Sequence, residues 1–139
     1  ENNDQVIELV TTLWQHCGTK ISCMSADQHD RVLATISHLP HILAFTLMSH
    51  VRASIEDKPE EILHFAGSSF RDCTRIASSS PEMWRDICLA NREALLKQID
   101  AYQKELTALR TTLANHNGEA LEKVFANAGE TRQQWLKSD

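Results

Sequence analysis

Apolar side chains recur along this chain at steps of three and four residues, the spacing that gathers them on one face of an α-helix. The first such run extends from Asp4 to Cys17, and Gly18 is expected to end that helix. No stretch alternates apolar and polar residues for long enough to make a convincing strand, and only four glycines and three prolines interrupt the chain. The pattern therefore predicts an all-α fold.

The second apolar run predicts a long helix that a proline disturbs. Ser25 and Gln28 form a capping-box pattern, so this helix is expected to begin there and to reach about Ala53. Pro40 lies inside the run, and it lacks an N–H while its ring crowds the preceding turn. The apolar pattern resumes beyond Pro40, so we expect a kink near Ile36 to Leu39 and not the end of the helix.

Shorter elements are expected in the middle of the chain. Asp57 with Glu60 predicts the start of a brief third helix that runs through Phe65. After a small-residue turn, a short helix is expected to carry Arg71 to Ala77. The three serines at 78–80 should then break the chain.

A proline at position 81 suits the first turn of a helix, and one long helix is predicted from Pro81 to about Ala114. Its apolar residues advance by alternating steps of four and three, as in a helix that packs along another helix over its whole length. These seam residues are Leu95, Ile99, Tyr102, Leu106, Leu109 and Leu113. Asn117 and Gly118 predict a break, followed by a more polar helix from Glu119 to about Leu136.

Composition narrows the class of protein further. A chain of 139 residues is expected to form a single domain over residues 1–139 with a real core, and a net charge of -5 argues against a nucleic-acid partner. The apolar runs are expected to be too short to span a membrane, and the first residues do not resemble a signal peptide, so no membrane partner and a cytoplasmic location are expected. Because it begins at Glu1 without a methionine, the chain is expected to be part of a longer protein.

The cysteines lie singly, without a CxxC pair, and several stand among apolar residues. We expect reduced thiols that fill the core, in preference to a disulfide framework or a zinc site. They are Cys17, Cys23, Cys73 and Cys88.

Candidate chemistry gathers in the stretch from Gly67 to Trp84, which reads GSSFRDCTRIASSSPEMW. Arg75 is its strongest candidate, because a guanidinium is always charged and its planar fork of donors suits a carboxylate. The alternative is a local ion pair of Arg75 with Asp72 or Asp86, since most arginines of a soluble domain serve structure alone.

A second group of polar residues lies beside Pro40. Ser37 precedes His41 by four residues and His38 precedes it by three, so these side chains share a helix face, and His29 lies about three turns earlier. A zinc site would need further ligands, and the chain has no HExxH motif, so no metal is predicted. Histidines satisfied by helix caps and neighbouring helices remain the alternative.

Two motifs resemble the helical domain of the prephenate and arogenate dehydrogenases of tyrosine biosynthesis, which are enzymes of aromatic amino acid biosynthesis. One is HDRVLATISHLPH, from His29 to His41, and the likeness extends from about Val6 to Leu113. The fold expected from it is the C-terminal domain of two-domain enzymes like 6-phosphogluconate dehydrogenase. The other motif consists of Phe70, Arg71, Asp72, Thr74, Arg75, Ile76, Ala77, Met83 and Trp84.

The resemblance implies a substrate site made by residues of both motifs. Arg75 matches the arginine that grips a substrate carboxylate, and Trp84 matches a tryptophan near the same pocket, although it could equally be a core aromatic. Gly67 matches a glycine-rich turn, but the family has further glycines where this chain has serines at positions 68 and 69. The residues implied to line or support the prephenate pocket are His41, His38, Ser37 and His29.

The activity implied is an oxidoreductase reaction in which prephenate loses CO2 and passes a hydride to NAD(P)+, giving 4-hydroxyphenylpyruvate. Its catalytic histidine and its cofactor site belong to an N-terminal Rossmann domain that this sequence lacks, because no GxGxxG turn follows a strand here. No catalytic, cofactor-binding or metal residue is therefore assigned, and the chain alone is expected to be inactive.

The resemblance also implies a homodimer that binds prephenate or arogenate. The sequence does not distinguish prephenate from arogenate as the substrate, or NAD from NADP as the cofactor. Fusion to another enzyme of the pathway and inhibition by tyrosine are also left open. Two other functions compete with this one: a non-catalytic helical dimerisation module, and the helical half of another NAD-dependent acid dehydrogenase.

Overall fold

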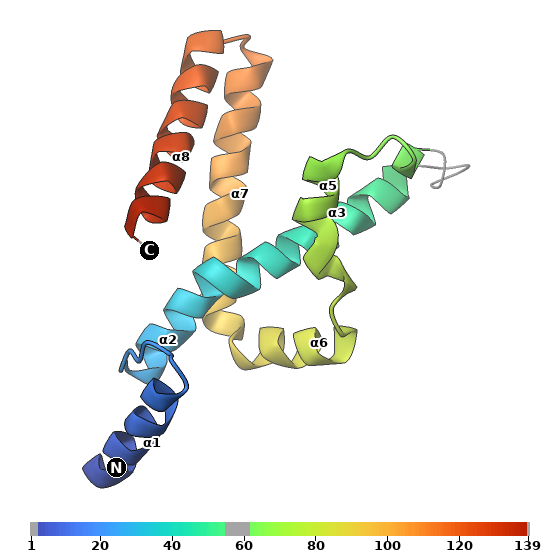
Figure 1. Ribbon diagram of the computed structural model, residues 1–139. Helices are drawn as coiled ribbons and strands as arrows, with labels where there is room; N and C mark the ends of the chain where they lie inside the picture. Colours follow the sequence, from blue (N-terminus) through green and yellow to red (C-terminus); the bar gives the residue numbers. More distant parts are fainter. Residues whose placement is uncertain (1–2, 55–61, 139) are drawn as a thin grey trace.

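The structure is a computed structural model that describes residues 3–54 and 62–138. Within those two ranges the chain forms helices joined by turns, and it contains no strand (Figure 1). The predicted all-α class is thus confirmed. The first helix, α1 (Asp4–His16), also follows the sequence pattern, and Gly18 has a φ of 78°, in the left-handed region that favours glycine after a helix.

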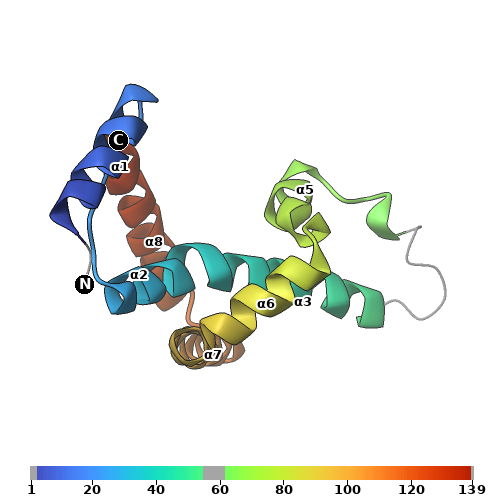
Figure 2. The same ribbon diagram turned by 90° about the horizontal axis from the view of Figure 1, so that it is seen from below.

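The centre of the fold is a single rod made of three helical segments, α2 (Ala26–Leu33), η1 (Ala34–His38) and α3 (Leu39–Ser54). Figures 1 and 2 both show it as one continuous element. The hydroxyl of Ser25 accepts the N–H of Gln28 at 3.2 Å, which confirms the predicted start of the rod.

Pro40 disturbs the rod where the sequence predicted a disturbance. The segment η1 is a π-helical turn, in which the N–H of Leu39 donates to the carbonyl of Ala34, five residues back. Proline has no N–H to continue the α-helical pattern, and the wider turn lets the helix pass the ring without ending.

The rod is long and apolar enough to cross a membrane by length and composition alone. An 18-residue window within residues 26–54 has a mean hydropathy of 1.4, which corrects the expectation that the apolar runs are too short for a membrane span. The helical segments α5, η2 and α7 of this chain contact the rod. The core helix of a soluble domain meets the same criteria, so this property by itself does not indicate a membrane protein.

Beyond residue 61, the predicted short helix is present in two parts. These are α5 (Ser68–Thr74) and the 3-10 turn η2 (Arg75–Ser78), which both pack on α3. The predicted caps at Asp57 and Glu60 lie outside the described residues.

The single helix predicted over 81–114 is wrong, because two helices occupy that range. α6 (Pro81–Ala90) ends at Asn91, whose φ of -105° and ψ of 31° lie outside the helical region. α7 (Arg92–Ala114) begins after it. The physical cause is tertiary: the Asn91 side chain is buried and bonds the rod instead of facing outward.

The last helix, α8 (Gly118–Ser138), follows the break that the sequence predicted. His116 turns the chain with a φ of 52°, and the amide oxygen of Asn117 accepts the N–H of Ala120 at 3.0 Å to cap α8. In Figure 1, α7 and α8 lie side by side as an antiparallel pair, and their contact is direct.

The buried core is small and lies where the rod crosses α6 and α7. A folded monomer of 15.7 kDa is expected to expose about 7,300 Å², whereas this chain exposes 11839 Å². The excess includes large apolar side chains on α1, α7 and α8. The buried residues are Ala34, His38, Ala44, Trp84, Asn91 and Leu95.

The cysteines are free, but their predicted role in the core is wrong. Cys17, Cys23 and Cys73 are exposed, and only Cys88 is half-buried. Because the core is confined to the helix crossing, thiols elsewhere in the chain remain at the surface. Burial raises the pKa of the Cys88 thiol.

Candidate functional site

The candidate site is built on a pair of stacked rings that join the rod to α6. The imidazole of His41 lies on the indole of Trp84 with 3.7 Å between ring centroids and 22° between ring planes. The ring of His38 meets Trp84 edge-on, at 6.0 Å and 80°. Trp84 is 7% exposed, so this aromatic cluster also belongs to the core. The two interpretations of Trp84, a pocket residue and a core aromatic, are therefore compatible.

Ser37 takes part in the cluster through its backbone. Its carbonyl oxygen lies 2.9 Å from Nδ1 of His41. A carbonyl can only accept, so Nδ1 of His41 carries the proton and Nε2 is left with a lone pair when the ring is neutral. This bond fixes the plane of the imidazole that stacks on Trp84.

His38 is held by a residue that the sequence analysis did not identify. Nδ1 of His38 accepts a hydrogen bond from Nδ2 of Asn91 at 3.2 Å, and the same amide nitrogen donates to the carbonyl of Asp30 at 2.8 Å. An asparagine within a predicted helix, where it is a poor helix former, was the only signal in the sequence for this role.

The surroundings of His38 disfavour the protonated form of its ring. Loss of hydration on burial lowers the pKa of His38 below its ordinary value, and this outweighs the nearby carboxylate of Asp30, which acts in the opposite direction. The neighbouring rings of His29 and His41 lower the pKa of His38 further.

The indole N–H of Trp84 is buried and has no hydrogen-bond partner among the described residues. Buried N–H groups are rarely left unpaired in folded proteins. The cluster thus contains a donor whose acceptor could come from a ligand or from another chain.

Arg75 begins η2, which packs against α3, and its side chain is exposed. It forms no ion pair with Asp72 or with Asp86; the carboxylate of Asp86 instead lies 2.8 Å from Nε of Arg85. The local ion pair proposed as the alternative role of Arg75 is absent from this structure.

Two other predicted site residues lie apart from the aromatic cluster. His29 is exposed, with Nδ1 at 3.1 Å from a carboxylate oxygen of Asp30. Gly67 precedes α5 with a φ of -75°, and a Cβ placed there would meet no atom of the described residues within 4 Å, so nothing in that part of the chain requires glycine. The structure brings together His38, His41, Trp84 and the backbone of Ser37, and no hydrogen bond or ring pair among the described residues joins His29, Gly67 or Arg75 to them.

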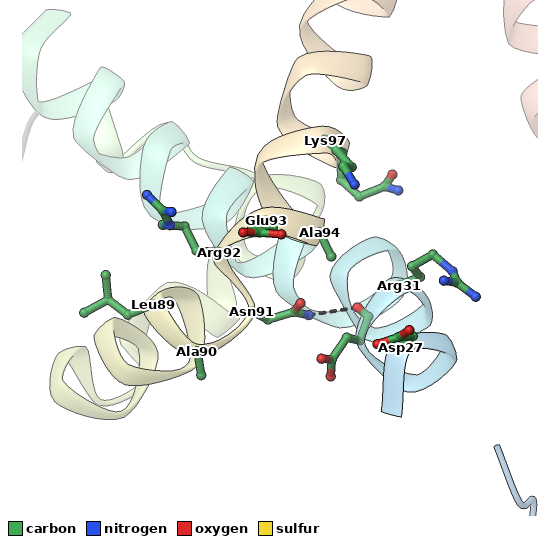
Figure 3. A pocket seen from close by; sticks show the side chains of 11 residues that line it. Asp27, Arg31, Leu89, Ala90, Asn91, Arg92, Glu93, Ala94 and Lys97 are labelled. Atoms are coloured by element: carbon green, nitrogen blue, oxygen red, sulfur yellow. Dashed lines mark hydrogen bonds between the residues drawn. The ribbon is translucent and has the colours of Figure 1, made fainter. Parts of the chain in front are cut away.

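A cavity of about 570 Å³ opens beside Asn91, between α2 and the junction of α6 with α7 (Figure 3). Its basic side chains, Arg31, Arg92 and Lys97, are matched in number by acidic ones, so the cavity has no preference for an anion. None of the predicted site residues lines it. In the described parts of the chain, no group of three or more metal-ligating side chains is close enough to hold a metal ion.

Comparison with known proteins gives one family. The family described as "Prephenate dehydrogenase, dimerization domain" matches residues 25–127. A cyclohexadienyl dehydrogenase of Zymomonas mobilis is 38% identical over 135 residues, which cover 97% of this chain and 46% of that protein. A prephenate dehydrogenase of Bacillus subtilis is 36% identical, over 95% of this chain and 35% of that protein.

Solved structures agree with this match. The prephenate dehydrogenase of Aquifex aeolicus in complex with hydroxyphenyl propionate and NAD+ has a TM-score of 0.87 and 32% identity, over 96% of this chain and 46% of that one. The Synechocystis arogenate dehydrogenase has a TM-score of 0.81 and 28% identity, over 96% of this chain and 48% of that one. The chain spans less than half the length of the curated relatives it matches. With a family match over 25–127 and a shared fold, the chain belongs to the family of prephenate dehydrogenase dimerization domains.

Proposed function

We propose that this chain is the substrate-binding and dimerisation part of a longer prephenate or arogenate dehydrogenase. The observation that carries the proposal is a convergence of two independent arguments. The resemblance implied a pocket containing Ser37, His38, His41 and Trp84, and Trp84, which is distant in sequence from the other three, meets them in one cluster. The activities for which the relatives are named supply the substrate class.

The site residues would bind and orient the substrate. The rings of His38 and His41, and the indole N–H of Trp84, which has no partner among the described residues, provide hydrogen-bonding groups beside an apolar aromatic surface. Arg75, on the neighbouring turn η2, would bind a carboxylate through its charged fork. Its exposed position suits a site that is completed when another domain closes over this face.

The oxidation is proposed to use NAD or NADP, which would accept the hydride as CO2 is lost. This cofactor would be held outside the present chain, because the described residues contain no strand followed by a glycine-rich turn that could cradle its pyrophosphate. The related Aquifex aeolicus enzyme is in complex with NAD+, which supports the cofactor class.

We also propose that the protein is a homodimer, as the family's description suggests. The predicted seam on α7 supports this, because the chain itself leaves part of the seam exposed. Leu95 is 4% exposed, whereas Leu106 is 53% and Leu113 is 62% exposed. A second copy would cover this apolar surface.

A cytoplasmic location is proposed on the basis of the cysteines. Three of the four thiols are exposed and none is paired, which suits a reducing compartment.

The test is an assay of the longer protein that contains this chain. With prephenate and NAD+ or NADP+, it should produce reduced cofactor, measured by absorbance, and arogenate should be compared in parallel. The chain of residues 1–139 alone should neither bind NAD+ in calorimetry nor turn over prephenate. Turnover by the chain alone would contradict the proposed division of roles. Inactivity of the longer protein with both substrates and both cofactors would favour a non-catalytic dimerisation module or a dehydrogenase for another acid.

A further inference from the structure

The amide of Asn91 uses both of its hydrogens on partners in the rod. Asn91 is 8% exposed, and its Nδ2 lies 2.8 Å from the carbonyl oxygen of Asp30 (dashed line in Figure 3) and 3.2 Å from Nδ1 of His38. A carbonyl oxygen only accepts, so the atom of Asn91 that faces Asp30 must be the donor nitrogen. The same nitrogen faces His38, and Nδ1 of His38 is therefore the acceptor.

This bond determines which tautomer His38 adopts. A neutral imidazole carries a single proton, and with Nδ1 accepting, that proton lies on Nε2. The charged and titratable groups that act on His38 are Asp30, His29 and His41, and together with burial they leave its pKa lowered. No hydrogen bond among the described residues uses Nε2 of His38, so its N–H is available to a ligand.

We propose that Asn91 is a positioning residue: it holds His38 as the Nε2–H tautomer, so that the ring presents a donor to an oxygen atom of the anionic substrate beside Trp84. A lone pair on Nε2 would instead repel a carboxylate or carbonyl oxygen. The identity of this ligand rests on the proposed function, whereas the tautomer does not. The role also explains why the chain interrupts a long helix at Asn91.

The first test is the tautomer itself. Nitrogen-15 NMR of the protein distinguishes protonated from unprotonated ring nitrogens, and the His38 signals are identified by their loss in His38→Gln. We expect Nδ1 of His38 to be unprotonated and Nε2 to be protonated at neutral pH. A neutral ring with its proton on Nδ1 would overturn the proposal, whatever the activity of the enzyme.

The second test is Asn91→Asp, which nearly preserves shape but replaces the donor to both Nδ1 of His38 and the carbonyl of Asp30 by a carboxylate that only accepts. Nδ1 of His38 must then donate, so the neutral tautomer inverts and the pKa of His38 rises. Below that raised pKa the doubly protonated ring still donates from Nε2, and above it the donor is lost. In the longer enzyme, KM for prephenate should therefore rise with pH by roughly twofold to tenfold relative to wild type, with little change in kcat.

The matched control is Asn117→Asp, which adds the same charge at another helix boundary. Asn117 caps α8 as an acceptor, and a carboxylate can do the same, so the His38 signals and KM should stay unchanged. A loss in Asn91→Asp that is independent of pH would overturn the proposal in favour of a purely structural role. If Nε2 of His38 carries the proton but the longer protein does not act on prephenate, the proposed function is wrong. If the longer protein is active but Nδ1 of His38 carries the proton, the proposed role of Asn91 is wrong.

Discussion

The guanidinium of Arg75 is the charged group on which the proposed substrate binding depends most. In the longer enzyme, Arg75→Ala should remove a charge-assisted contact of about 1.5 to 3 kcal/mol and raise KM for prephenate roughly tenfold to a hundredfold. Arg75→Lys should recover only part of this, because an ammonium keeps the charge but loses the planar fork. Steady-state kinetics of both variants measures the effect.

Thermal unfolding separates this role from a structural one. Arg75 is exposed and pairs with neither Asp72 nor Asp86, so its replacement should leave the melting temperature nearly unchanged. Arg85→Ala is the matched control, because it breaks a surface ion pair with Asp86. This variant should leave KM unchanged and should lower stability only slightly. A normal KM in a well-folded Arg75→Ala enzyme would refute the role in substrate binding.

His38 should make the stability of the fold depend on pH. Its folded-state pKa is lowered from 6.5, mainly by burial, so between the two values the unfolded chain binds more protons and stability rises with pH. The contribution of a neutral His38 is complete above 6.5 and is lost as the pH falls through the folded-state pKa. Urea unfolding on both sides of this window should show a smaller pH dependence for His38→Gln than for wild type. An equal pH dependence in His38→Gln and wild type would contradict this contribution of His38.

At the scale of the helices, the start of the rod depends on a single cap. The hydroxyl of Ser25 accepts the N–H of Gln28, which would otherwise lack a partner within the helix. Ser25→Ala should lower the free energy of unfolding by about 1 kcal/mol. Ser49→Ala makes the same chemical change at an exposed position inside α3, where no cap is lost. It should not lower the free energy of unfolding. Equal effects of the two variants in urea unfolding would contradict the capping role.

At the scale of the whole molecule, the small core and the large exposed surface fit the proposed homodimer. A stable dimer built on such helices should bury well over ~2,000 Å². Replacing the exposed seam residues together, as Leu106→Glu with Leu113→Glu, should place charges in that interface and shift the protein towards monomers. Sedimentation at micromolar concentration measures this shift.

The control for the seam is Gln103→Glu, which adds a charge on α7 outside the predicted seam and should leave the dimer intact. A wild-type protein that sediments as a stable monomer would contradict the dimer. Dissociation by Gln103→Glu as readily as by the seam variant would show that the interface lies elsewhere on α7.

The sequence by itself determined the features whose causes are local. The periodicity of α1 and α8, the cap at Ser25 and the passage of the rod through Pro40 all depend on neighbours within a few residues, and they were predicted correctly. The motifs also identified the family, because they record residue types in order along the chain.

Only the tertiary structure decided the features whose partners are distant in sequence. Asn91 interrupts the predicted helix because it bonds Asp30 and His38, which lie 61 and 53 residues away. The stack of His41 on Trp84 likewise depends on the crossing of two helices. The exposure of the cysteines depends on how few residues this fold buries. Helical spacing fixes which face a side chain occupies, but its partner is chosen by how the helices cross, and no local pattern encodes that geometry.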